Sequence, residues 1–112
     1  ALRVDPRNDA AHLNLALLLA EMDRMDDAEQ AFRNTLEVNP RSAVAAFNLG
    51  VLLLTKDPDQ GLYWCRKASR LRPEDGRYAY TYAYCLHQNG DVDLAVEELQ
   101  GRVAKNTDYG PA

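Results

Sequence analysis

A repeat of about 34 residues runs through the chain and constrains its fold more than any other feature. Three prolines mark it, because Pro6, Pro40 and Pro73 stand at nearly equal intervals along the sequence. They occur in the similar phrases Arg-Val-Asp-Pro-Arg, Glu-Val-Asn-Pro-Arg and Leu-Arg-Pro-Glu. Self-similarity at this period indicates stacked supersecondary units, each burying its apolar face against its neighbours. The 112 residues therefore hold about three such units.

Each unit has the apolar spacing of two amphipathic helices. Leu15 and Leu19 in the first half of a unit, and Ala28, Phe32 and Leu36 in the second half, recur at steps of three to four residues, which places them on one helix face. Turn signals separate the halves, since Asp57-Pro58 suits a helix start and Asn89-Gly90 suits a helix end, and Ser42 can cap another helix. We expect helices over residues 9–22, 26–38, 43–56, 58–71, 76–88 and 92–105.

The residues at fixed positions of each unit resemble the tetratricopeptide repeat (TPR) family, whose hairpins carry large and small residues in a set order and end on proline. The residues that carry the resemblance are His12, Leu15, Ala16, Leu19, Ala28, Phe32 and Pro40; Ala46, Leu49, Gly50, Leu53, Gly61, Cys65, Ala68 and Pro73; and Ala79, Tyr82, Ala83, Leu86, Ala95 and Leu99. The resemblance implies an all-α fold, a right-handed α-solenoid of three helix-turn-helix hairpins with six antiparallel helices.

The repeats divide the chain into a single domain with predicted internal boundaries. Residues 1–8 are interpreted as the tail of a preceding repeat, 9–42, 43–75 and 76–107 as repeats 1 to 3, and 108–112 as the start of a further repeat. The second repeat is one residue short in the turn at 56–59, and in the third Thr107 replaces the closing proline while Arg102 fills a usually small position. The chain is interpreted as a fragment of a longer, bacterial array.

The resemblance implies a concave wall, formed by the first helix of each hairpin, as the binding surface. The inward residues expected from the family are Leu13, Asn14, Leu17, Val44, Phe47, Asn48, Val51, Leu54, Arg77, Tyr80, Thr81, Tyr84 and His87. Phe47, Tyr80 and Tyr84 would be energetic anchors, since aromatic residues dominate interface hot spots. Asn14 and Asn48 would either hydrogen-bond the backbone of a ligand or brace neighbouring helices, and the apolar residues would either face the groove or pack between first helices.

The function that this surface implies is a non-catalytic scaffold binding a peptide or partner protein. One alternative is self-association through the groove or the open repeat ends, giving a homo-oligomer. Another is an accessory TPR tail of a larger enzyme or periplasmic multihaem cytochrome, from the loose similarity of the stretches 63–67 and 78–81 to bacterial tails of that kind. A clamp for the carboxylate of a chaperone tail is not expected, because Leu13, Leu17 and Thr81 stand where clamp residues should be polar or basic.

No pattern for chemistry or for other classes of partner is present. His12 and His87, the two histidines, have no partner at metal-ligand spacing, so neither a metal nor another cofactor is expected. Cys65 and Cys85 form no CxxC motif and are interpreted as apolar core residues, with a disulfide between them as the less favoured alternative.

Nucleic-acid and membrane partners are not expected either. The net charge of −4 argues against nucleic acid, and the basic cluster at 66–77 is interpreted as a solvated face, with a docking site for an acidic partner as the minority interpretation. No apolar run reaches the roughly 20 residues of a membrane span. The compartment stays open, with the cytoplasm favoured over the periplasm.

Overall fold

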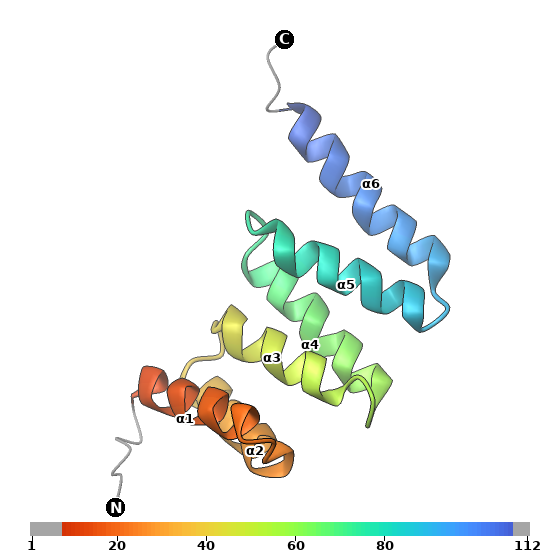
Figure 1. Cartoon of the computed structure of the whole chain (residues 1–112). Coiled ribbons are helices and arrows are strands. Elements are labelled where there is room, and N and C mark those ends of the chain that lie inside the picture. The colour runs from red at the N-terminus through yellow and green to blue at the C-terminus, as the bar shows by residue number, and fades with distance from the viewer. Residues whose placement is uncertain (1–7, 109–112) are drawn as a thin grey trace, which may run out of the picture.

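The computed structural model describes residues 8–108, and their side chains as far as residue 101. Its helices, in chain order, are α1 (Asp9–Glu21), α2 (Met25–Val38), α3 (Ala43–Leu53), α4 (Pro58–Leu71), α5 (Gly76–Gln88) and α6 (Val92–Asp108). Consecutive helices pair as three hairpins that follow one another from α1 at one end of the molecule to α6 at the other (Figure 1). The all-α solenoid predicted from the repeat is therefore confirmed. The predicted tail of a preceding repeat and start of a further one fall almost wholly outside the described residues.

Side-chain caps begin the helices where the sequence indicates. Ser42 Oγ accepts a hydrogen bond from the Ala45 amide (3.3 Å) at the start of α3. Asp57 Oδ1 accepts one from the Gln60 amide (3.4 Å), and Pro58 is the first residue of α4, where the missing N–H costs nothing. Gly90 ends the α5 turn with a φ of 90°, the left-handed conformation that favours glycine.

Two predicted helix boundaries were wrong by several residues. The third helix was expected to run to residue 56 but ends at Leu53, because the turn after it closes with tight bonds from the Leu54 amide to Val51 O (3.3 Å) and from the Lys56 amide to Leu53 O (3.1 Å). The second repeat is one residue shorter than the first, and this tight turn is where the shortening lies. The last helix was expected to end at residue 105 and continues to Asp108.

The two helices of the second hairpin approach each other closely. A Cβ atom built on Gly50 of α3 would lie 2.8 Å from the Cys65 amide nitrogen and 2.9 Å from Gly61 O, both on α4. A Cβ atom on Gly61 would in turn lie 2.9 Å from Gly50 O. Two glycines therefore face each other where the first and third hairpins have alanine, at Ala16 with Ala28 and at Ala83 with Ala95.

The buried apolar residues form two clusters. The first joins the first two hairpins around Phe32, Leu49 and Leu53, and Tyr78 at the start of α5 also belongs to it. The second contains Cys65 together with four buried residues of the last hairpin, Tyr82, Cys85, Leu86 and Ala95. No helix among residues 8–108 is both long and apolar enough to cross a membrane.

Candidate functional site

The predicted groove residues of the first repeat are only partly available to a ligand. Leu13 and Leu17 of α1 are half-buried and pack against the first core cluster. Asn14, between them in sequence, is exposed. Its amide has both a donor and an acceptor, and Asn14 is the one polar side chain of the predicted set in this repeat.

The second repeat divides its predicted residues between exposed and packed positions. Val44 and Val51 of α3 are 40% and 43% exposed. Phe47 is half-buried, with its ring centroid 5.1 Å from that of Tyr78 on α5. Phe47 therefore joins neighbouring first helices, one of the two roles that the sequence left open for these apolar residues.

The side-chain amide of Asn48 makes one hydrogen bond within its own helix. Its Nδ2 donates a hydrogen bond to Val44 O, one helical turn back, at 2.8 Å. An asparagine side chain has two N–H donors and one carbonyl acceptor, so this bond leaves one N–H and the carbonyl oxygen of Asn48 without a partner among the described residues.

The third repeat carries the most exposed large apolar side chains of this face. Tyr80 and Tyr84 on α5 are 52% and 64% exposed, and they lie one helical turn apart. Thr81 is half-buried, and His87 is exposed one turn beyond Tyr84. The sequence reasoning placed these four residues on one helix, and the structure shows that Tyr80 and Tyr84 are open to solvent.

Arg77, the one charged residue in the predicted set, forms an ion pair with Asp75, the N-cap residue of its own helix. Its Nε and Nη2 donate to the two carboxylate oxygens of Asp75 at 3.1 Å and 2.8 Å. The hydrogen bonds from Arg77 are the main cause that lowers the pKa of Asp75 below its ordinary value. The arginine side chain in this pair is 82% exposed, so the pair is a surface ion pair of the kind that contributes little free energy.

An apolar hollow between α5 and α6 is lined partly by predicted groove residues and partly by residues that were not predicted to bind. Its volume is about 400 Å³, and its lining consists of Tyr80, Ala83, Tyr84, His87, Val92, Ala95, Val96 and Leu99. The sequence reasoning missed the α6 side of this hollow. The signal was present, since Val92, Val96 and Leu99 recur at steps of four and three residues and remain 48%, 45% and 41% exposed.

A second hollow lies on the other side of Tyr84. It has a volume of about 350 Å³ and is lined by Leu54, Thr55, Pro58, Leu62, Tyr84, Cys85, Gln88 and Asn89. This hollow is next to the shortened turn between α3 and α4. Tyr84 therefore forms a ridge between two largely apolar hollows.

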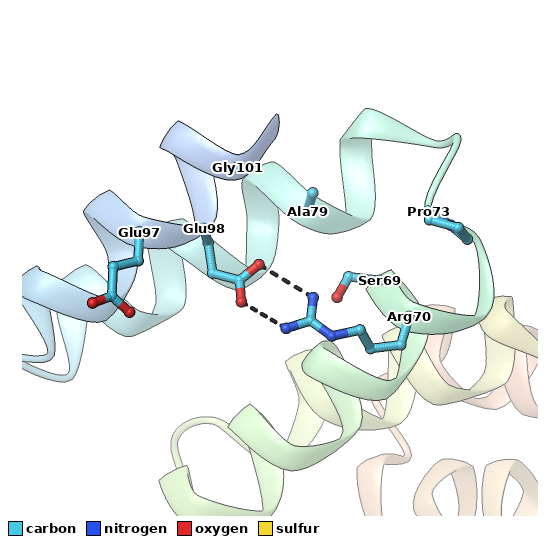
Figure 2. Close-up of a pocket in the computed structure, with 7 residues that line it drawn as sticks. All are labelled: Ser69, Arg70, Pro73, Ala79, Glu97, Glu98 and Gly101. Carbon is cyan, nitrogen blue, oxygen red and sulfur yellow. Dashed lines mark hydrogen bonds and ion pairs between the residues drawn. The ribbon is translucent and has the colours of Figure 1, made fainter. Parts of the chain in front are cut away.

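A third hollow, of about 260 Å³, is more polar and is crossed by an ion pair. Figure 2 shows Arg70 of α4 reaching the carboxylate of Glu98 on α6, with Nη1–Oε2 and Nη2–Oε1 distances of 3.2 Å and 2.8 Å. Each charged group satisfies the other, and Ser69 Oγ donates to Arg66 O at 2.7 Å. The arrangement fastens two neighbouring hairpins and presents no activated nucleophile.

The two cysteines are free, buried and adjacent. Burial, with a smaller effect of the neighbouring Cys85 thiol, raises the pKa of Cys65 to about 12. A thiol with so high a pKa is a poor nucleophile and a poor metal ligand at neutral pH. Within the part of the chain that the structure describes, no three His, Cys, Asp or Glu side chains are grouped so as to hold a metal ion.

Comparison with known proteins agrees with the fold. A family model described as "Tetratricopeptide repeat" matches residues 1–33, 13–68 and 57–111. The crystal structure of MamA aligns with a TM-score of 0.82 at 19% identity, over 94% of this chain and 62% of that one. The crystal structure of YrrB, titled a TPR protein with an unusual peptide-binding site, aligns with a TM-score of 0.77 at 23% identity, over 89% of this chain and 52% of that one. The chain thus spans less than two thirds of either solved chain, and it matches none of the curated proteins compared with it.

Proposed function

Because the chain belongs to the tetratricopeptide repeat family, we propose that it is a non-catalytic scaffold that binds a peptide or a partner protein on one face. The proposed binding face consists of the outward side chains of α1, α3 and α5, in particular Asn14, Val51, Tyr80 and Tyr84. The peptide-binding site announced for YrrB, whose fold is similar, supports the same kind of activity here.

The observation that carries the proposal is the exposure of Tyr80 and Tyr84. Two tyrosines one turn apart, more than half exposed, stand beside an apolar hollow with Val51 exposed on the preceding repeat. Large aromatic side chains that bury much area at a low cost in side-chain entropy are typical energetic anchors of interfaces. Covering them with apolar side chains of a partner would stabilise a complex by the hydrophobic effect.

The chemistry of the face defines the partner further. Arg77 is held by Asp75, so the face offers no uncompensated charge among its predicted residues. Asn48 contributes a carbonyl oxygen and one N–H, and Asn14 contributes a complete amide. A ligand that matches these groups is a mainly apolar segment whose backbone N–H and C=O groups meet the asparagine side chains.

The test is a selection of peptides on the chain, followed by comparison of matched tyrosine variants. Random peptides displayed on phage would be selected against the wild-type protein, and the dissociation constants of the enriched sequences measured by fluorescence anisotropy. Tyr80→Ala and Tyr84→Ala are expected to weaken binding about tenfold or more each, the loss typical of an interface anchor. The control is Tyr63→Ala on α4, because Tyr63 is 52% exposed, as Tyr80 is, but lies outside the proposed face.

Two results would contradict the proposal. One is that no peptide is enriched above the background of the selection. The other is that Tyr63→Ala weakens binding as much as Tyr80→Ala does, because the tyrosines on the proposed face would then have no special role.

A further inference from the structure

We propose that the outward side of α4 is a second interaction surface, which binds an acidic segment of a partner protein. This surface, called the α4 strip below, consists of Tyr63, Trp64, Arg66, Lys67 and Arg70. A hollow shared with α2 lies along one side of α4, and a hollow shared with α5 and α6 lies along the other. The strip is separate from the binding face on α1, α3 and α5, so its function goes beyond the one proposed above.

The α4 strip concentrates positive charge in a chain that is acidic as a whole. Four of the 13 basic residues lie within residues 66–72, a stretch without an acidic residue, although the net charge of the chain is −4. The positions 63, 66, 67 and 70 recur at steps of three and four residues, so their side chains share one face of the helix. A partner that complements this face carries negative charge.

Two of the three cations on the strip are free to meet such a partner. Arg70 is held by Glu98, as Figure 2 shows. Arg66 is exposed and forms no ion pair with a carboxylate among the described residues. The Lys67 ammonium lies 5.5 Å from the ring centroid of Trp64, a cation–π contact that leaves it without a carboxylate. An acidic side chain can therefore pair with Arg66 or Lys67 without breaking an existing ion pair.

Two aromatic rings add an apolar contact beside these charges. Tyr63 is 52% exposed, and its ring meets that of Trp64 edge to face, with centroids 5.0 Å apart. The hollow next to Trp64, of about 380 Å³, is lined on the α2 side by Leu36 among others, and its one basic residue, Arg33, is already paired with Glu29 at 3.1 Å. Tyrosine, tryptophan and arginine together are typical of interface hot spots. The acidic segment is therefore expected to carry a large apolar side chain that covers Tyr63.

Acidic residues on both sides of the strip determine which class of partner fits. Glu37 of α2 lines the hollow beside Trp64, and Glu97 of α6 lines the hollow beside Arg70. The positive strip is thus about one helix wide, roughly 10 Å. A nucleic-acid duplex or a lipid surface would bring its phosphates against these carboxylates as well, whereas a single peptide segment can run along α4 and avoid them. Charge complementarity therefore favours an acidic protein segment.

The experiment measures the binding of defined peptides to the full chain. The probe is the fluorescently labelled peptide Glu-Glu-Leu-Glu-Glu-Phe, and its counterpart has glutamine in place of every glutamate. Fluorescence anisotropy gives the dissociation constant, and the emission of Trp64, the one tryptophan of the chain, reports contact at the strip itself. The glutamate peptide should bind, change the Trp64 emission and bind more weakly as salt is added. The glutamine peptide should bind about tenfold more weakly or worse.

Matched variants locate the binding on the strip. Arg66→Glu should weaken the glutamate peptide about tenfold or more, because it sets like charges against each other. Arg41→Glu is the control, since it makes the same change of charge at an exposed position outside the strip. The double variant Arg66→Glu/Lys67→Glu should lose the glutamate peptide and instead bind Lys-Lys-Leu-Lys-Lys-Phe, which would be a rescue by reversed charge. Circular dichroism should show that all variants keep the helix content of the wild type.

The tyrosines separate this surface from the proposed groove. Tyr63→Ala should weaken the glutamate peptide and leave peptides selected on the groove unaffected, whereas Tyr84→Ala should do the reverse. Failure of either proposal is thus visible without the other. The α4 strip would be overturned by absence of saturable binding, by equal losses in Arg41→Glu and Arg66→Glu, or by a glutamate peptide that depends on Tyr84. Single-stranded oligothymidine that binds as tightly as the glutamate peptide would also overturn it, because the strip would then bind any anion.

Discussion

The glycine pair between α3 and α4 gives a sharp prediction, that Gly50→Ala destabilises the protein although alanine is the better helix former. An added Cβ would lie 2.6 Å from Cys65 Sγ, 2.8 Å from the Cys65 amide nitrogen and 2.9 Å from Gly61 O. Ordinary contacts between heavy atoms lie at about 3.5–4.0 Å. The thiol could rotate aside, but two of the three atoms belong to the α4 backbone, so the whole helix would have to move.

The size of the effect follows from two opposing contributions. Alanine in place of glycine inside a helix stabilises by about 1 kcal/mol. An extra methyl group that cannot be accommodated in a packed site costs about 1–3 kcal/mol, and a contact with backbone belongs at the upper end of that range. The net expectation is a loss of about 1–2 kcal/mol, which lowers the melting temperature by about 4 °C per kcal/mol for a chain of this length.

The assay is thermal and urea unfolding followed by far-ultraviolet circular dichroism, with Gly101→Ala as the control. Gly101 also lies in a helix, but a Cβ built on it meets nothing within 4 Å. Gly101→Ala should therefore leave stability unchanged or raise it by up to about 1 kcal/mol, as helix propensity alone predicts. If Gly50→Ala raised the melting temperature as Gly101→Ala does, the close approach of α3 and α4 would be refuted.

Three other predictions test single features of the molecule. A peptide ending in Glu-Glu-Val-Asp should show no micromolar binding in a calorimetric titration, because Leu13, Leu17 and Thr81 stand where a carboxylate clamp needs polar or basic side chains; micromolar affinity would contradict this. The free energy of unfolding should fall as pH rises above about 9, by up to about 1.4 kcal/mol per pH unit, and the fall should be smaller in Cys65→Ala. The reason is that the unfolded chain releases the thiol proton while the folded chain, in which the pKa of Cys65 is about 12, retains it; equal slopes in urea titrations would refute it. Arg70→Ala should cost about 0.5–1 kcal/mol at low salt and less at high salt, since its pair with Glu98 is partly exposed; a loss that salt does not reduce would show that packing, not charge, is what matters.

The helices and their stacking were predictable from the sequence because the information is local and repeated. Capping residues such as Ser42 and Asp57, and the left-handed Gly90, mark ends that depend on a few neighbouring residues. The left-handed Asp23, with a φ of 61°, was not predicted, since aspartate adopts this conformation only where the turn requires it.

The details of the binding face were less predictable because they depend on contacts between hairpins. Phe47 and Val51 lie one turn apart on the same helix, yet the first packs against Tyr78 and the second is exposed. The hollow beside α6 is lined by residues of both α5 and α6, so the spacing of Val92, Val96 and Leu99 indicated its α6 side but not how the two helices pack. The spacing of Asp75 and Arg77 in the sequence permits the ion pair between them but does not show that it forms.

The division of the buried residues into two clusters has a consequence for how the protein loses its structure. The first cluster ties the first two hairpins to Tyr78, whereas α6, among its side chains described up to residue 101, contributes only Ala95 to the second. In a linear array the stability is a sum of unit terms and nearest-neighbour terms, so a unit with weaker coupling opens before its neighbours. Amide hydrogen exchange should accordingly be fastest in α6 and slowest in α2 and α3. The last hairpin could then open and reclose many times while the rest of the molecule stays folded, which makes the order of unfolding directional along the chain.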